Sequence, residues 1–423
     1  MGSFKKNRVH FLNTVYFSSL CIIKNKQKQY EKVIDYDCVL VRDVERVDHT
    51  GEIHSKPSPH LPLDEVARML SALPIEKVQM QEVHNAVSSS SSNGYDEEYM
   101  MRDIFASPGN GVGDSPAETK AYTRPLRDLI SEHLSKMERT KSSGGGMSAD
   151  QYIVALENSD IQIYWPECNT WDREKLPILT FDPGNGAEVN VGYRMILKEN
   201  GERILEEVVV DEAMASEEPV WVVNRNDDSG FLSLEKLREQ DPEWGNGGGS
   251  LVVKPKSWAL ETPGVVKSLV LKDFKMLRNY DCWFAGASEF FIKCGSVEDF
   301  TASTEAELKL YSPRITDFML VVRRSQVGQT IPLNVMLVSR WTEQLDDIAF
   351  MMTEDDGGTR TEWKCSAVVK VKSRSYGFDL ALPFNSRDDI VWRGQLSSKY
   401  LEKYDGITSR LGDVEVTFSL LQR

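Results

Sequence analysis

A strict alternation of apolar and polar residues near the C-terminus constrains the fold of this chain more than any other feature. Between Trp363 and Lys372, every second residue is apolar or small, and most of the residues between them are Lys or Ser. Residues 414–420 repeat this period of two. Such a period places alternate side chains on opposite faces of a strand. Both segments therefore predict antiparallel strands with one solvated face.

Further strand candidates follow at the spacing that is typical of β-sandwiches. They are residues 290–294, 306–311, 318–323, 333–341, 348–353 and 376–382. With the two alternating segments they make about eight short strands. We predict an antiparallel β-sandwich for residues 251–423.

Residues 61–146 have a helical period instead. Val66, Met69, Leu70 and Leu73 recur at the spacing of one helix face, and Pro74 separates this helix from the next. We expect this helical hairpin to end in a break at the five serines of residues 88–92. Residues 1–60 show no sustained period and are expected to be a largely disordered leader and linker.

Short strands with a few helices are expected in residues 147–250. A capping box formed by Ser148 and Gln151 predicts the start of a helix. From Asp160 onward the period changes to two, and Asn200-Gly201 is a strong hairpin signal. The predicted fold class is α+β, mainly β, with helical N-terminal segments, β-rich domains and a C-terminal antiparallel β-sandwich.

The distribution of histidine limits the chemistry. All six histidines lie between His10 and His133, whereas all nine tryptophans lie in the following 290 residues. The tryptophan-rich part therefore cannot use a Ser-His-Asp triad, a Cys-His pair or a zinc site with His ligands. What remains is carboxylate chemistry or binding.

Charge and cysteine content limit the partners. The net charge of −15 argues against binding to nucleic acid, because an acidic surface repels phosphate. The six cysteines form no CxxC pair, and we interpret them as mostly buried apolar residues. If the protein is exported, Cys282 and Cys294 are the pair that we expect to form a single disulfide.

Acidic residues in two predicted loops are the strongest candidates for a site. Glu354, Asp355 and Asp356 precede two glycines, and Asp388-Asp389 follow a second turn. Carboxylates in such loops are common ligands of Ca²⁺, so these five residues are predicted to hold a structural calcium ion. The alternative is that they are solvated turn residues. In a simple meander both loops lie at one end of the sandwich, together with Asp299, whereas Asp281 lies at the opposite end.

A second pattern resembles the calcium-binding loop of an EF-hand. Asn224, Asn226 and Asp228 alternate, and Glu235 follows at the twelfth position. Gly230 stands one place late, and the preceding segment is typical of a strand. A turn that leads into a helix explains these residues better.

Tryptophan suggests a different kind of binding. Trp171, Trp244 and Trp283 lie in polar or glycine-rich surroundings, and we expect them to be exposed and to bind a ligand. They are the candidates for stacking on a sugar in a carbohydrate-binding module. A carboxylate-dependent hydrolase of glycans or peptides is a further alternative, although the sequence singles out no pair of acids.

Four segments carry a resemblance to known proteins. They are residues 61–70, 219–228, 284–291 and 354–363. They resemble segments of lipid-anchored envelope proteins of gut Bacteroidales, a group without an established activity. The resemblance covers residues 61–423 and implies export.

The N-terminus agrees only in part with export. Residues 4–21 imitate a basic region, a short apolar region and a lipidated cysteine at Cys21, but polar residues interrupt the apolar stretch. An export signal and a plain basic leader both remain open, and no apolar run is long enough for a transmembrane helix.

These observations lead to one functional expectation. We expect a non-enzymatic protein of the cell envelope or cell surface that binds a protein or glycan partner, with the calcium-stabilised sandwich as its C-terminal part. A lipid anchor at Cys21 and a cytoplasmic location are the alternatives that the leader leaves open. No catalytic residue and no organic cofactor is expected.

Overall fold

The computed structural model of the chain describes residues 61–106, 125–140, 147–198, 202–226, 231–242, 244–245 and 267–422. The predicted leader 1–60, the hairpin turn Asn200-Gly201 and the glycine-rich segments 142–146 and 246–249 lie outside these residues. The α-helices are α2 (Leu63–Ser71), α3 (Lys77–Ser92), α4 (Met101–Phe105), α5 (Pro125–Thr140), α6 (Ala149–Glu157), α7 (Glu212–Glu217), α8 (Leu234–Gln240) and α9 (Ser398–Lys403). The 3₁₀ helices are η2 (Cys168–Thr170), η3 (Glu305–Leu310) and η4 (Arg324–Gln326).

The strands fall into an N-terminal and a C-terminal group. The N-terminal strands are β1 (Glu98–Met100), β2 (Ile161–Tyr164), β3 (Ile178–Phe181), β4 (Val189–Leu197), β5 (Arg203–Asp211) and β6 (Val220–Arg225). The C-terminal strands are β7 (Lys267–Met276), β8 (Ser288–Ser296), β9 (Arg314–Val322), β10 (Ile331–Trp341), β11 (Leu345–Glu354), β12 (Arg360–Val371), β13 (Arg374–Asn385), β14 (Asp389–Ser397), β15 (Thr408–Leu411) and β16 (Val414–Gln422).

The central strands β2 and β6 of the N-terminal sheet are buried on both faces, whereas the edge strand β5 is largely exposed. Its strand order is β1-β2-β6-β3-β4-β5, and β3 runs parallel to β6. Helices α2 to α6 bury one face in a core that includes Trp221, while Trp283 and Phe284 bury the other face. Because both faces are covered, Val220–Val223 are all apolar and buried and show no alternation.

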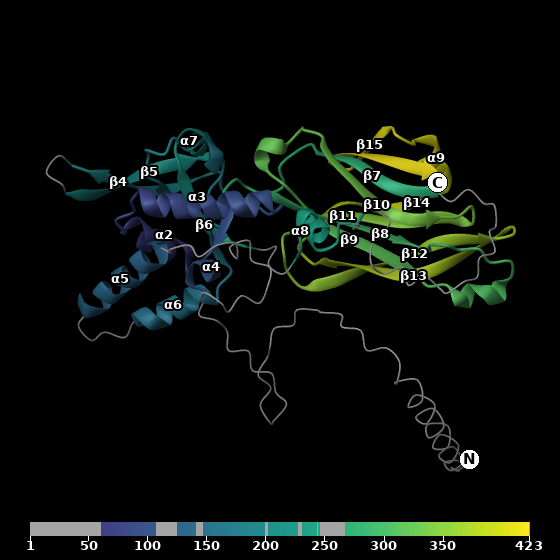
Figure 1. Ribbon diagram of the computed structural model, residues 1–423, viewed down its shortest axis with the longest axis horizontal. Coiled ribbons are helices and arrows are strands. Elements are labelled where there is room, and N and C mark those ends of the chain that lie inside the picture. The colour runs from purple at the N-terminus through teal and green to yellow at the C-terminus, as the bar shows by residue number, and fades with distance from the viewer. Residues whose placement is uncertain are drawn as a thin grey trace, which may run out of the picture. The chain divides into compact units, whose positions relative to one another are not determined.

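The C-terminal strands form the predicted sandwich (Figure 1). One sheet has the order β10-β7-β16-β15, and the other has the order β13-β12-β11-β8-β9, with β14 also paired to β11. The core between the sheets contains Phe274 and Val414 from the first sheet and Phe290 and Phe350 from the second. The predicted fold class, mainly β with N-terminal helices, is thus confirmed.

Several local predictions are also confirmed. The capping box forms as expected, because the Ser148 side chain accepts a hydrogen bond from the Gln151 amide and the Gln151 side chain bonds back. Strands β4 and β5 form the antiparallel hairpin that the sequence between them predicts. On β12, Ala367, Val369 and Val371 are buried, in agreement with the alternation.

Two local predictions are wrong. The segment 306–311, predicted as a strand, lies mostly in η3 (Glu305–Leu310). The Glu307 carboxylate accepts hydrogen bonds from Ser303 and Thr304 at the start of η3, and Leu308 and Tyr311 contact the core with helical spacing. The five serines do not break α3. Ser90 is buried, and the helix ends at Ser92, the last of the five serines, two residues before Gly94, which adopts a φ of 78°.

The expected disulfide is absent from the described residues. Cys282 and Cys294 are both free thiols. Cys294 lies on β8 in the core of the sandwich, so it serves as the buried apolar residue that most of the cysteines were predicted to be.

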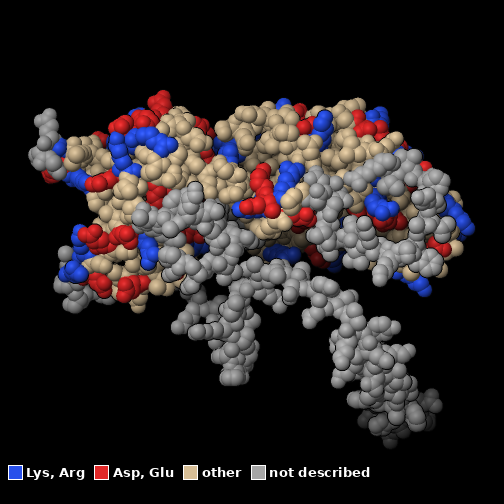
Figure 2. Space-filling view, viewed as in Figure 1, with Lys and Arg blue, Asp and Glu red and all other residues tan. Residues whose placement is uncertain are grey.

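Charges are mixed on the surface of the described residues. On the face drawn in Figure 2, Lys and Arg lie among Asp and Glu, and exposed ion pairs such as Arg374 with Glu305 are frequent. Among the described residues, no helix combines the length and the apolar character that a membrane span requires.

Candidate functional site

The C-terminal sheet brings the two predicted acidic loops together. Strand β11 is antiparallel to both β8 and β14, so the end of β11 lies beside the starts of both neighbours. Glu354, the last residue of β11, is opposite Phe290 on one side and Asp389 on the other. The loop after β11 and the loop before β14 therefore lie at the same end of the sheet, as the sequence suggested.

Three carboxylates from two segments converge at this end. Asp281, Glu354 and Asp356 each contribute an oxygen atom, and these atoms lie within 4.8 Å of one another. Glu354 is 1% exposed, whereas Asp356 is exposed at the rim. Oxygen atoms that surround a Ca²⁺ ion at about 2.4 Å are at most about 4.8 Å apart, so oxygen atoms within this limit can share one such ion. Asp281 joins this cluster from the segment that precedes β8.

The sequence-based prediction placed Asp281 and Asp299 at the wrong ends of the sandwich. Asp281 was expected opposite the acidic loops but belongs to the cluster, while Asp299 pairs with Arg340 beyond the other end of β8. The error follows from residues 306–311. In an antiparallel meander, each strand carries the chain from one end of the sandwich to the other. Counting residues 306–311 as a strand therefore adds one crossing between Asp299 and Glu354. This extra crossing assigns Asp281 and Asp299, which precede it, to the wrong ends of the sandwich.

Burial raises the pKa of two of the clustered acids, Asp281 and Asp356. The pKa of Asp281 is raised to about 6, mainly by burial, with a further increase from the charge of Asp356 and an opposing effect of a hydrogen bond with Glu354. The pKa of Asp356 is also raised, first by burial and then by Asp389 and Asp355. Negative charge at this end of the sheet is therefore unfavourable when no cation is bound.

A second carboxyl pair lies beside the first cluster. Asp355 is 1% exposed, and its Oδ1 atom accepts hydrogen bonds from the Gly357 amide at 2.9 Å and from Asn385 Nδ2 at 3.0 Å. Its other oxygen, Oδ2, is buried and accepts no hydrogen bond from the described residues. The same holds for Oδ1 of Asp388, whose pKa is raised to about 7 by burial and, to a smaller extent, by Asp355. When both acids are ionised, two buried carboxyl oxygens thus lack a donor, whereas a protonated Asp388 can donate a hydrogen bond to Asp355.

Basic side chains compensate this negative charge only in part. Arg278 lies 3.8 Å from Asp389 but donates its closer hydrogen bond, of 2.8 Å, to Asp413. Arg387 lowers the pKa of Asp356, but this is the smallest of the effects on that group. Of the five predicted residues, the structure brings Glu354 and Asp356 together with Asp281. Asp355, Asp388 and Asp389 lie at the same end of the sheet, beside this cluster.

The residues of the EF-hand-like pattern have other roles. Asn224 is 1% exposed on β6, and its Nδ2 atom donates to the main-chain oxygens of Phe284 and Ala285 at 3.0 and 2.6 Å. Asn226 Nδ2 donates to Glu98 at 2.8 Å. Asp228 lies outside the described residues. The two asparagines thus hold neighbouring segments in place, while the turn of the alternative interpretation falls largely outside the described residues.

The three candidate tryptophans contact three different hydrophobic clusters. Trp171 packs near Trp165, and Trp244 packs near Phe318, with ring centroids 5.6 and 5.8 Å apart respectively. Trp283 is 1% exposed, which contradicts its expected exposure, because it covers the second face of the N-terminal sheet. They do not form a common stacking surface.

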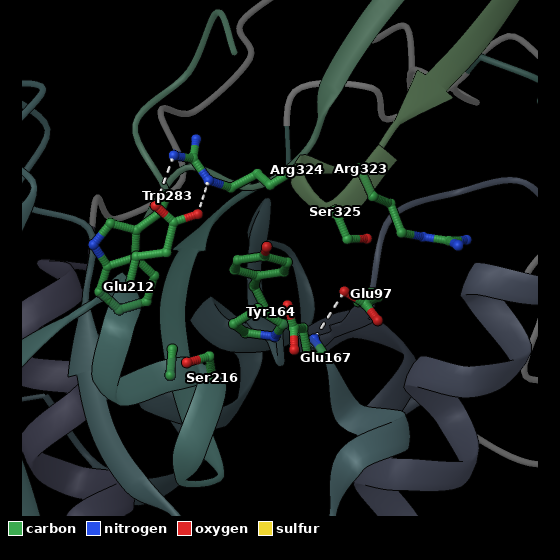
Figure 3. A pocket seen from close by; sticks show the side chains of 11 residues that line it. Glu97, Tyr164, Glu167, Glu212, Ser216, Trp283, Arg323, Arg324 and Ser325 are labelled. Atoms are coloured by element: carbon green, nitrogen blue, oxygen red, sulfur yellow. Dashed lines mark hydrogen bonds and ion pairs between the residues drawn. The ribbon is translucent and has the colours of Figure 1, made fainter. Parts of the chain in front are cut away.

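Sequence reasoning missed a pocket of about 50 Å³ (Figure 3). Segments around residues 97, 164–167, 212–216, 283 and 323–325 line it. Glu97 and Tyr164 are its most deeply buried polar residues, with 8% and 3% exposure. No local pattern in the sequence joins these segments, since only the tertiary fold brings them together. The raised pKa of Glu97, about 7, marks the pocket as unusual.

The fold and the acidic cluster define a mainly β α+β protein with a candidate divalent-cation site. A comparison of the chain with family models, curated proteins and solved structures finds no match.

Proposed function

We propose that this is a non-enzymatic binding protein whose C-terminal sandwich is stabilised by a calcium ion. The observation that carries the proposal is the convergence of Asp281, Glu354 and Asp356 within 4.8 Å. The buried Oδ2 atom of Asp355, which accepts no hydrogen bond from an N–H group of the described residues, is consistent with it. A divalent cation near these groups offsets the repulsion between carboxylates that burial otherwise makes costly.

The loops explain why such an ion would stabilise the fold. Asp281 precedes β8, and Asp356 follows β11, so one ion bound to both joins two segments that are distant in sequence. An ion that binds only the folded chain shifts the folding equilibrium by mass action. The end of the sandwich that the loops form would then be ordered for contact with a protein or glycan partner.

We further propose a location in the cell envelope or outside the cell. This part of the proposal rests on the resemblance to envelope proteins and includes a possible lipid anchor at Cys21. Calcium sites of extracellular modules bind with dissociation constants of about 10⁻⁴ to 10⁻³ M, which suits a site with few well-placed ligands. Fractionation of cells that express the full chain, compared with a Cys21→Ala variant, tests the location and the anchor.

The alternative functions receive less support. A pocket of about 50 Å³ is far below the ~300 Å³ at which typical ligand sites begin, so it would not enclose a glycan or peptide substrate. A carbohydrate-binding module needs aromatic rings on one surface, whereas Trp171, Trp244 and Trp283 belong to separate clusters.

Thermal melting of the full chain tests the calcium proposal. We expect the melting temperature in millimolar CaCl₂ to exceed that in EDTA by several degrees, with a smaller effect of MgCl₂. The Asp281→Asn/Asp356→Asn variant should lose this increase, because it removes two of the three converging carboxylates. Asp379→Asn is the matched control, since Asp379 is an exposed acid on β13 of the same sheet. Equal melting temperatures in calcium and EDTA would contradict the proposal.

A further inference from the structure

The pocket in Figure 3 lies outside the acidic cluster and has its own chemistry. Tyr164 ends β2, and Glu97 lies just before β1, which pairs with β2. Trp283, from the segment before β8, contributes an apolar wall. The pocket volume of about 50 Å³ suits a single small polar group and not a whole metabolite.

Two buried polar groups in the pocket have unused hydrogen-bonding capacity. Tyr164 is 3% exposed, and its hydroxyl group makes no hydrogen bond to another described residue. The Oε2 atom of Glu97 accepts one hydrogen bond, from the Glu167 amide at 3.1 Å. Glu97 forms no ion pair within the described part of the chain. Both side chains can therefore accept a hydrogen bond from a ligand.

The charges around Glu97 favour a cationic ligand. Asp96, the neighbouring residue, is 4% exposed and accepts a hydrogen bond from the Ala287 amide at 3.0 Å. Arg323 is near enough to act on both acids, but it donates its hydrogen bond of 2.8 Å to the main-chain oxygen of Ser91. Arg324 is held by Glu212 through contacts of 2.7 and 3.1 Å. When Glu97 is ionised, the pocket is lined by the three acids Glu97, Glu167 and Glu212 but by only two arginines, so it carries an excess of negative charge.

We propose that this pocket binds a primary ammonium group, which donates hydrogen bonds to the Glu97 carboxylate and to the Tyr164 hydroxyl oxygen. The aromatic rings of Tyr164 and Trp283 line the pocket and add surroundings that favour an organic cation. The group can belong to an alkylamine such as a lysine side chain or to the N-terminus of a peptide. This inference is independent of the calcium site, so either one can fail alone.

Binding of an ammonium group should change the protonation of Glu97. Burial, followed by the charge of Asp96, raises the pKa of Glu97 to about 7, while the Glu167 amide and Arg323 oppose this increase and the Glu167 carboxylate adds to it. About half of the free molecules therefore carry a proton on Glu97 at pH 7. Because the ammonium group favours the carboxylate, binding at pH 7 should release up to about half a proton per ligand, and binding at pH 9 should release almost none.

Calorimetric titration of the full chain with n-butylammonium chloride tests the proposal. Titrations at pH 7 in phosphate and in HEPES, which differ in ionisation enthalpy, report the number of protons released. We expect saturable binding with proton release, and no comparable binding of n-butanol. Glycinamide, a mimic of a peptide N-terminus, is titrated in parallel. Whichever of the two amines binds more tightly identifies the source of the ammonium group.

Variants locate the binding in the pocket. Glu97→Gln keeps an oxygen acceptor for the Glu167 amide but removes the charge, so it should lose at least tenfold in affinity and all proton release. Tyr164→Phe should lose a few-fold in affinity, and Glu157→Gln, an exposed acid on α6, should lose none. Absence of binding by both amines, equal binding of n-butanol, or unchanged affinity in both pocket variants would overturn the proposal.

Discussion

The Nη1 atom of Arg324 donates a hydrogen bond of 2.8 Å to the main-chain oxygen of Asp281. Its Nε and Nη2 atoms bond to Glu212 on α7, so one guanidinium group ties this helix to the segment that precedes β8. Asp281 contributes its carboxylate to the acidic cluster, and Arg324 lines the pocket. The two candidate sites therefore share a structural support.

Removal of this support should weaken the fold and the calcium site together. We expect Arg324→Met to lower the free energy of unfolding by about 1–3 kcal/mol, because the side chain is only 15% exposed and its partners lose a charged donor. Arg340→Met, which removes the exposed ion pair with Asp299, should cost less than about 1 kcal/mol. Urea denaturation measures both values, and equal costs would show that Arg324 has no special role.

Gly286 should tolerate no side chain. Its φ of 130° is unfavourable for other residues, and an added Cβ would lie 2.6 Å from Asp96 Oδ2. We expect Gly286→Ala to destabilise the protein by about 2–4 kcal/mol. Gly184→Ala separates the two causes, since Gly184 has a φ of 69° and open space around it. Its expected cost is about 1–2 kcal/mol. A smaller loss for Gly286→Ala than for Gly184→Ala in the same assay would be inconsistent with the close contact.

Glu97 should make stability fall as the pH rises. Its pKa is raised from 4.5 in the unfolded chain to about 7 in the folded chain, so the folded state binds more protons between these values. The stabilising contribution is complete below about pH 4.5 and is lost as the pH rises through 7. Compared with Glu97→Gln, the wild type should lose up to about 3 kcal/mol between pH 4.5 and pH 8. Parallel pH profiles of the two proteins in denaturation experiments would refute this assignment.

Asn385 offers a test of the second carboxyl pair. Asn385→Asp replaces the donor to Asp355 Oδ1 with a third carboxylate beside Asp355 and Asp388. In EDTA we expect a loss of about 1–3 kcal/mol in the free energy of unfolding. Calcium should reduce this loss by at least half, since the added carboxylate can then contact a cation. An equal loss with and without calcium would exclude a cation near Asp355.

The sandwich was predictable in part because strands such as β12 have one solvated face, whereas β8 is buried at every position. On β12 the alternation of Ala367, Val369 and Val371 with polar residues follows directly from burial of one face. Strands β7 and β14 escaped prediction. β14 begins at Asp389 and mixes exposed and buried positions without a clear period. Helix α3 was cut short because serine favours turns in isolation, whereas here Ser90 is buried by tertiary contacts.

The acidic cluster could be predicted in part from the sequence, whereas the pocket around Glu97 could not. Counting the strands between two loops correctly placed Glu354 and Asp388 at the same end of the sheet, because two strands, β12 and β13, separate them. The same argument failed for Asp281 and Asp299, since residues 306–311 pack with a helical spacing that a short segment does not reveal. The pocket could not be predicted at all. Its residues Glu97, Glu212 and Arg324 each belong to a separate segment, and only the folded chain brings them together.

Direct calcium binding tests the central claim most directly. Calorimetric titration of the metal-free full chain with CaCl₂ should show saturable binding with a dissociation constant of about 10⁻⁴ to 10⁻³ M. The Asp281→Asn/Asp356→Asn variant should bind at least tenfold more weakly, while Asp379→Asn should match the wild type. Absence of calcium binding by the wild type, or the same affinity in the double variant, would contradict a calcium ion at the end of β11.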